Sequence, residues 1–288
     1  MSTNALEGLF EFEDVEVSCE KHGMQIDRRM TMFNGKPHLQ PGEPTCPICL
    51  EEKARAKGAE ERAQRAAEHV ERIVKASRIP LNYANFSFGD YRTEIAAQQR
   101  IVDLCTRYTA SLAERKNPGW LVLSGRPGNG KTMLLGCMVR ALAAARITSL
   151  YITQAAMGRE FRATYQRNAE ISEAELFDRY AEVPVLMLDE LAVFSTEGTD
   201  RVLFELLDSR YANGRPTVIA TNHPRNRLED VLGERLFDRL REAATFLAFD
   251  WESARKPAGQ RSRDASSVTE LAPSRHSPQA PSDSSISV

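Results

Sequence analysis

Residues 120–132 read WLVLSGRPGNGKT and combine an apolar run with a glycine-rich loop. From Gly125 to Thr132 the sequence fits G-x-x-x-x-G-K-[ST], the pattern of a loop that binds phosphate groups. The preceding run, Trp120–Ser124, is typical of a buried strand, and residues 133–146 have the pattern of a helix. A chance glycine-rich turn would not need a strand before it and a helix after it. We therefore interpret this segment as a phosphate-binding loop.

The loop predicts ATP as the ligand, together with Mg²⁺. Its glycines allow successive backbone N–H groups to point inward, and the following helix adds the positive end of its dipole. Lys131 is expected to reach the β- and γ-phosphates, and the Thr132 hydroxyl is expected to bind Mg²⁺. The predicted nucleotide contacts are Gly125, Pro127, Gly128, Asn129, Gly130, Lys131, Thr132 and Met133.

Two further apolar runs end in polar residues that suit the same site. Residues 183–190, VPVLMLDE, bring Asp189 and Glu190 to the end of a buried strand, at the sheet edge where the loop also lies. Asp189 is predicted to bind Mg²⁺, and Glu190 to polarise an attacking water. Residues 217–222, TVIATN, end in Asn222, which is placed to orient that water or to contact the γ-phosphate. Each strand end alone is a common turn feature, but their order after the loop favours one shared site.

Residues 79–255 alternate apolar runs with helical patterns. The predicted strands are Trp120–Ser124, Ser149–Thr153, Val183–Asp189, Thr217–Thr221 and Thr245–Asp250, and the predicted helices are 131–146, 155–167, 173–181, 200–213 and 228–242. Strands that are apolar almost throughout are buried on both faces, and the intervening helices cover them. The predicted fold class is therefore α/β, with a parallel sheet covered by helices.

Three other segments flank this core. Residues 1–50 are predicted to form a loop-rich N-terminal region, and residues 51–78, dense in Ala, Glu, Arg and Lys, a single helical linker that is solvated on most faces. Residues 256–288 are rich in Ser and Pro, which predicts a disordered tail. The 288 residues thus provide one α/β domain and a smaller appendage.

Composition and charge narrow the function classes. Apolar residues at 42% and charged residues at 27% are ordinary for a soluble protein, and no run approaches the roughly 20 apolar residues that cross a bilayer. The N-terminus lacks the basic start and apolar run of a signal peptide, so we expect a cytoplasmic protein without a membrane partner. The net charge of -2 does not indicate nucleic-acid binding, although a local stripe of arginine could still contact phosphates.

Four residues of the N-terminal region have the spacing of a zinc site. Cys19 and His22 form one pair, Cys46 and Cys49 form the other, and two-residue spacers let each pair bind one metal ion. Four protein ligands close the site, which favours a structural role. His38 is an alternative nitrogen ligand. The remaining cysteines, Cys105 and Cys137, occupy apolar helix positions and are expected to be inert core residues.

The nucleotide motifs together resemble those of AAA+ ATPases, with a phosphate loop (Walker A), the Leu188-Asp189-Glu190 strand end (Walker B) and Thr221-Asn222 (sensor 1). Residues 232–241, LGERLFDRLR, and 249–253, FDWES, resemble more specifically the bacterial DnaC-type replicative helicase loaders, and residues 78–91 resemble the start of the ATPase domain in that family. The resemblance covers about residues 75–255 and implies an AAA+ domain over 79–255. No helical lid follows Trp251, so no sensor 2 arginine is assigned.

This resemblance implies an ATPase that binds the hexameric replicative DNA helicase and delivers it onto single-stranded DNA. It also implies that the N-terminal region binds the helicase and that the ATPase domains self-associate, with one subunit's arginine completing the next subunit's site. Arg239 matches the arginine finger of the family, and Arg235 lies one turn before it on the same helix face. Without the resemblance, ion pairs with Glu234 and Asp238 would be the simpler interpretation of both arginines.

The single-stranded DNA contacts are predicted by residue type alone, since such surfaces combine basic and aromatic side chains. The candidates are Phe161, Tyr165, Phe194, Arg159 and Arg162; aromatic residues four apart on a helix are also typical of a core. Two other functions share the motifs. One is an IstB-type transposition-helper ATPase, and the other is an adaptor whose phosphate loop binds but does not hydrolyse ATP.

Overall fold

A five-stranded parallel sheet forms the centre of the α/β domain. The computed structural model describes residues 11–33, 36–38, 46–192 and 197–253. The strand order is β5-β6-β7-β4-β8, with β4 (Trp120–Gly125), β5 (Ser149–Thr153), β6 (Val185–Leu191), β7 (Thr217–Thr221) and β8 (Ala244–Phe249). The predicted α/β class is confirmed. All five predicted strands are present, and two of them, β5 and β7, have the predicted bounds.

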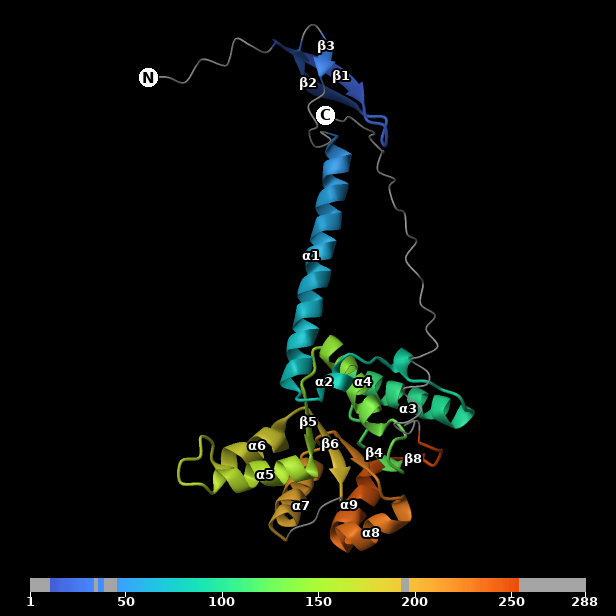
Figure 1. Cartoon of the computed structure of the whole chain (residues 1–288), viewed down its shortest axis with the longest axis vertical. Coiled ribbons are helices and arrows are strands. Elements are labelled where there is room, and N and C mark those ends of the chain that lie inside the picture. Colours follow the sequence, from blue (N-terminus) through green and yellow to red (C-terminus); the bar gives the residue numbers. More distant parts are fainter. Residues whose placement is uncertain (1–10, 34–35, 39–45, 193–196, 254–288) are drawn as a thin grey trace, which may run out of the picture.

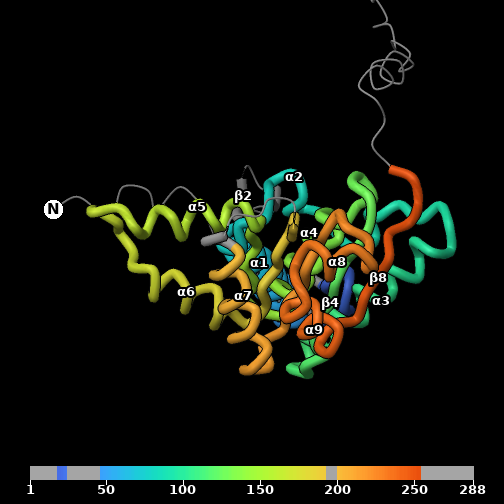
Figure 2. Tube along the Cα trace, turned by 90° about the horizontal axis from the view of Figure 1, so that it is seen from below, coloured from blue at the N-terminus to red at the C-terminus, as the bar shows by residue number. Residues whose placement is uncertain are grey.

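Helices cover both faces of this sheet because each strand is apolar on both sides. Alternate residues of β4 belong to different cores: Leu121 and Leu123 to one, Trp120 and Val122 to the other. The first core contains residues of α3 (Ala96–Ala113) and α4 (Lys131–Ala144). The second contains residues of α5 (Gln154–Thr164), α6 (Glu173–Glu182) and α7 (Glu197–Ala212). In a view along the long axis, α3 lies on one flank of the molecule and α5 and α6 on the opposite flank (Figure 2).

Local sequence signals fix several helix ends. Ser172 and Glu175 form a capping box at the start of α6, in which the Glu175 amide donates to the Ser172 hydroxyl and the Ser172 amide to the Glu175 carboxylate. The predicted helix over 228–242 is wrong as a single element. Gly233, with φ 77° and ψ 156°, separates α8 (Arg225–Leu232) from α9 (Glu234–Ala243).

The helical linker is the 30-residue α1 (Pro47–Ala76), which begins four residues before the predicted start and so includes Cys49. Its first two thirds are almost entirely exposed, in agreement with the prediction of a solvated helix. Near its end Val74 is buried, and Val70 and Ile73 pack against the core that contains α4. α1 therefore projects from the α/β domain like a stalk and packs against that domain through its C-terminal end (Figure 1).

The N-terminal region differs from the loop-rich prediction. Residues 11–38 contain an antiparallel sheet with the order β1-β2-β3, built from β1 (Glu11–Ser18), β2 (Gln25–Phe33) and β3 (Lys36–His38). This sheet lies at the far end of α1 (Figure 1). Within the described ranges no helix is both long enough and apolar enough to span a bilayer. The predicted tail, 256–288, lies outside the described residues.

Candidate functional site

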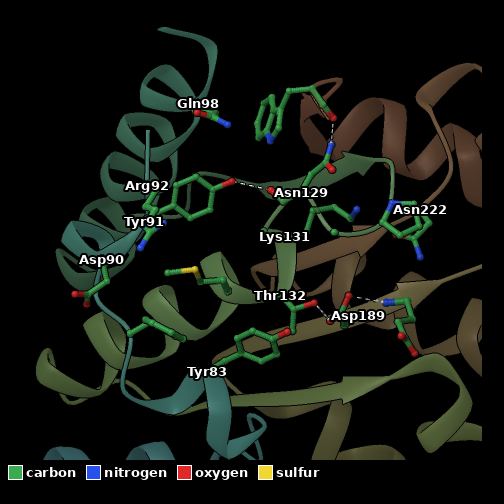
Figure 3. Close-up of a pocket in the computed structure, with 17 residues that line it drawn as sticks. Tyr83, Asp90, Tyr91, Arg92, Gln98, Asn129, Lys131, Thr132, Asp189 and Asn222 are labelled. Carbon is green, nitrogen blue, oxygen red and sulfur yellow. Dashed lines mark hydrogen bonds between the residues drawn. The ribbon is translucent and has the colours of Figure 1, made fainter. Parts of the chain in front are cut away.

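The predicted nucleotide residues meet at the C-terminal edge of the sheet. β4, β6 and β7 are parallel neighbours, so the loop after β4, the carboxylates of β6 and Asn222 after β7 reach the same edge. A cavity of about 650 Å³ lies there. Its lining includes the predicted residues Pro127, Gly128, Asn129, Gly130, Lys131, Thr132, Met133, Asp189, Glu190 and Asn222 (Figure 3). The structure therefore brings these predicted residues together around one cavity.

The phosphate loop has the backbone geometry that its glycines predict. Gly130 has φ 86° and begins α4, and a Cβ atom there would lie 2.6 Å from the ring of Tyr91. Lys131 is 6% exposed, and its Nζ donates to the carbonyls of Gly125 and Arg126 at 2.7 and 2.8 Å. The ammonium group is thus already held inside the curve of the loop, where phosphates would bind.

Asp189 is held by donors on both carboxylate oxygens. The Thr132 hydroxyl donates to Asp189 Oδ2 at 2.8 Å, and the Glu190 amide donates to Oδ1 at 2.8 Å. Two oxygen ligands of the kind that Mg²⁺ prefers are therefore adjacent at the start of α4. The Tyr151 hydroxyl also donates to Oδ2, at 3.0 Å, and burial raises the pKa of Tyr151 above its usual range.

Glu190 is displaced from the regular strand. It has φ 54°, Ala192 has φ 69°, and the pairing of β6 with β7 shifts register between Leu188 and Leu191. Positive φ at non-glycine residues is uncommon and is found most often at functional sites. The bulge lets Asp189 stay buried while Glu190, the next residue, is exposed and lines the cavity.

Seven cavity residues were not assigned a role from the sequence. They come from the segment before α3, from the first turn of α3 and from the end of the domain: Tyr83, Phe86, Asp90, Tyr91, Arg92, Gln98 and Trp251. The Tyr91 hydroxyl donates to the Asn129 carbonyl at 2.7 Å, and the Asn129 side-chain amide donates to the carbonyls of Phe249 and Trp251 (Figure 3). Hydrogen bonds therefore connect the loop to segments near both ends of the α/β domain. In the sequence, residues 85–91 and Trp251 contributed to the family resemblance, but their residue types did not indicate a contact with nucleotide.

The two arginines of α9 do not line this cavity. Arg239 Nε donates to Asp208 Oδ1 at 3.1 Å, and its guanidinium lies 4.8 Å from the centre of the Tyr211 ring. Arg235 is exposed, and its guanidinium lies 5.1 Å from the ring of Phe204. Among the described residues, neither Arg235 nor Arg239 forms an ion pair with Glu234 or Asp238. Asp238 pairs with Arg241 instead. Both arginines thus lie on α9, outside this cavity.

The Cys/His residues converge as their spacing predicts. Cys19 and His22 lie in the turn between β1 and β2, where Gly23 has φ 64°, and Cys46 and Cys49 lie at the start of α1. The ligand atoms of Cys19, His22, Cys46 and Cys49 lie within 4.8 Å of one another. The side chain of His38, the alternative ligand, is outside what the structure describes.

The distances within this cluster fit a tetrahedral metal. His22 Nδ1 lies 3.8, 3.7 and 3.3 Å from the sulfurs of Cys19, Cys46 and Cys49, and the Cys19 and Cys49 sulfurs are 3.7 Å apart. Zinc–ligand bonds of ordinary length would place neighbouring ligands roughly 3.5–3.8 Å apart. Backbone amide donation from His22 lowers the pKa of Cys19 to about 6, which favours a thiolate. His22 Nε2 lies 3.4 Å from Glu52, which orients the ring.

The candidate DNA contacts separate into core and surface residues. Phe161 is buried and packs against Tyr180, with ring centres 6.1 Å apart, so it is a core residue. Tyr165 is 64% exposed, and Arg159 and Arg162 are also exposed on α5. Phe194 lies outside the described residues. Cys105 and Cys137 are buried in the core, as predicted.

Known proteins are similar to this chain in both sequence and fold. It is 29% identical over 234 residues to the replicative helicase loader DnaC of Escherichia coli strain K12, an alignment that covers 81% of this chain and 94% of that protein. The crystal structure of DnaI superposes with a TM-score of 0.53 at 25% identity, covering 62% of this chain and 95% of that one. A crystal structure of the DnaC helicase loader has the same fold, with a TM-score of 0.52, 20% identity, and coverage of 59% and 99%.

A family model extends this similarity. The model of the IstB-like ATP binding proteins matches residues 54–262, which include every residue of the nucleotide cavity. That match spans nearly three quarters of the sequence. Because the match covers well over half of the sequence, the chain belongs to the family of IstB-like ATP binding proteins.

Proposed function

We propose that this chain is a helicase loader, a Mg²⁺-dependent ATPase that binds the replicative DNA helicase and delivers it onto single-stranded DNA. Membership of the family makes it an ATP-binding protein with a phosphate loop. The observation that carries the loader function is the alignment with a replicative helicase loader over 94% of that protein's length. The complete set of polar groups in the cavity supports hydrolysis.

The cavity has a polar end for the triphosphate and an aromatic end for the base. The loop amides and Lys131 bind the β- and γ-phosphates, replacing the carbonyls that Lys131 now contacts. Thr132 and Asp189 hold Mg²⁺, which neutralises charge on those phosphates. Tyr83, Tyr91 and Trp251 line the remainder of the cavity and suit a planar purine.

Hydrolysis is assigned to the residues beside the γ-phosphate position. Glu190 accepts a hydrogen bond from the attacking water, and Asn222 orients it. Arg239 of a neighbouring subunit contacts the γ-phosphate and stabilises the charge that develops there. Its half-exposed position, outside the cavity of its own subunit, supports action between subunits. Arg235, one turn earlier, supports the same contact.

The N-terminal region, residues 1–50, is the proposed helicase-binding module. Cys19, His22, Cys46 and Cys49 hold a structural Zn²⁺ that joins the β1–β2 turn to the start of α1. Three large apolar side chains next to these ligands are exposed: Met24, Ile48 and Leu50. Exposed apolar groups on a small, rigid module suit a protein partner. Residues 51–78 are the linker, and 79–255 are the ATPase domain.

The proposal is tested by size-exclusion chromatography of the full chain with the hexameric replicative helicase, with and without ATP and Mg²⁺. Co-elution is expected, and loss of co-elution under both conditions would reject the loader function. The rival transposition helper predicts co-elution with a transposase instead. Lys131→Ala tests the catalytic part: it is expected to lower ATP turnover at least 100-fold, whereas unchanged turnover would favour the non-hydrolysing adaptor.

A further inference from the structure

One buried tyrosine contacts the proposed Mg²⁺ ligands without lining the nucleotide cavity. Tyr151 lies on β5 and is 7% exposed. Its hydroxyl donates to Asp189 Oδ2 at 3.0 Å, the same oxygen that accepts from Thr132. In the register of β5 and β6, Asp189 is opposite Thr153, so Tyr151 is two residues from that pair on the same face of the sheet. A long side chain at this diagonal position reaches the carboxylate.

The backbone of Tyr151 is itself fixed from outside the sheet. Its amide donates to the carbonyl of Ser77 at 2.7 Å. Ser77 is fully buried, and it is the residue that ends α1. Val74 of α1 belongs to the same apolar core as Tyr151. The backbone of Tyr151 is therefore held by the C-terminal end of α1, and its side-chain hydroxyl contacts Asp189.

The Asp189 carboxylate needs a donor that remains in place when Mg²⁺ binds. Thr132 is a proposed ligand of the metal, so its oxygen must then face the ion. The Glu190 amide occupies the other carboxylate oxygen, Oδ1. Tyr151 is neither a proposed ligand nor part of the loop, and its donation to Oδ2 fixes the rotation of the carboxylate. Partners of this kind orient metal ligands and strengthen metal binding.

We propose that Tyr151 is a positioning residue, which holds Asp189 in the orientation that binds Mg²⁺ with ATP. This rests on the proposed Mg²⁺-dependent ATPase function. The tyrosine is not a proposed ligand of nucleotide or metal, so its loss weakens metal binding and leaves the nucleotide contacts of the loop intact.

The test compares Tyr151→Phe with the wild-type full chain. Binding of a fluorescent ATP analogue is measured over a range of Mg²⁺ concentrations, and binding of Mn²⁺ in the presence of nucleotide is measured by electron paramagnetic resonance. The variant is expected to need about tenfold more metal for half-maximal effect, with the metal-free nucleotide affinity unchanged. Turnover at low Mg²⁺ falls and is restored by raising the Mg²⁺ concentration.

The matched control is Tyr180→Phe. Tyr180 is fully buried, and its hydroxyl donates to the Glu160 carboxylate at 2.6 Å, but it does not line the nucleotide cavity. This control is expected to keep the wild-type metal dependence. An unchanged metal requirement in Tyr151→Phe, with a normal Mg²⁺ effect in the wild type, overturns the inference alone. A wild type that shows no Mg²⁺ effect overturns both the inference and the proposed function. A thermal melt followed by tryptophan fluorescence shows whether each variant is folded.

Discussion

The two ends of α1 belong to regions that reach stability by different means. At the C-terminal end, the ATPase domain packs two apolar cores against a five-stranded sheet. At the N-terminal end, a three-stranded sheet and the first turn of α1 meet at four potential metal ligands. A region of that size rarely folds on apolar burial alone, and metal binding can supply the missing free energy. We therefore propose that apolar burial stabilises the first region and that a metal ion stabilises the second.

Removal of zinc should have the largest effect, and only on the N-terminal region. Binding of structural zinc contributes on the order of 10 kcal/mol to the folding of small modules. We expect the purified chain to contain one zinc ion per molecule, as measured by elemental mass spectrometry. Chelation, or the double variant Cys46→Ser and Cys49→Ser, should abolish the protection of β1 and β2 amides from hydrogen exchange.

The ATPase domain should be unaffected by the same treatment. Both tryptophans of the sequence, Trp120 and Trp251, lie in that domain, so the unfolding midpoint by tryptophan fluorescence should not change. Cys105→Ala is the control, because this buried core cysteine is not a ligand and the variant should retain one zinc. If the metal-free chain kept full protection of the β1 and β2 amides from hydrogen exchange, the N-terminal region would not depend on a metal for its stability.

Loss of a buried arginine should have the next largest effect, confined to the ATPase domain. Arg210 is fully buried, and it donates to the carbonyls of Tyr180, Ala181, Val183 and Pro216 and to the Thr217 hydroxyl. Desolvation lowers the pKa of Arg210 to about 9, so it remains charged at neutral pH. Arg210→Met leaves those acceptors without their donor and should reduce the free energy of unfolding by about 3 kcal/mol or more.

Urea unfolding followed by tryptophan fluorescence measures this change. Arg201→Met on the same helix is the control, since Arg201 makes an exposed pair with Glu205 and its loss should cost less than about 0.5 kcal/mol. If the two variants lost equal stability, the hydrogen bonds from Arg210 to the end of α6 and the start of β7 would not contribute to the stability of the domain. Zinc content should be unchanged in both.

The sequence predicted the ATPase domain better than the N-terminal region, for a physical reason. Strands that are buried on both faces are apolar throughout, so their positions are visible in the residues themselves. The loop, Asp189 and Asn222 follow such strands, and parallel topology brings strand ends together. The strands of residues 11–33 were missed because the alternation of apolar and polar residues in EFEDVEVS is short and is interrupted at Asp14.

Other features depend on contacts that no spacing encodes. Tyr151, Tyr91 and Trp251 reach the site through the packing of distant segments. The break at Gly233 was missed because the helical pattern continues on both sides of it. The Cys/His cluster could be predicted because zinc sites restrict both residue type and spacing, whereas a positioning tyrosine resembles any core tyrosine in the sequence.

A methyl group on the phosphate loop should have a moderate and local effect. In Gly130→Ala, the new Cβ would lie 2.6 Å from the Tyr91 ring, at a φ of 86° that alanine disfavours. We expect about tenfold weaker binding of a fluorescent ATP analogue, measured by anisotropy. Gly233→Ala is the control, because it also has a positive φ but no atom within 4 Å of the new Cβ. It should alter stability without altering nucleotide affinity, and equal affinities for the two variants would contradict the role of the Tyr91 contact.

The smallest effect should come from the ion pair that joins the C-terminal end of α1 to α4. Arg140 of α4 lies 3.0 Å from Glu71 of α1, with the side chains 33% and 55% exposed. Exposed pairs contribute little, so Glu71→Gln should lower the free energy of unfolding by less than about 0.5 kcal/mol. Val74→Ala, three residues later, removes buried methyl groups and should cost about 1–2 kcal/mol by urea unfolding. If Glu71→Gln cost more than Val74→Ala, charge and not apolar packing would anchor the stalk, and the stability of the ATPase domain would depend on salt concentration through α1.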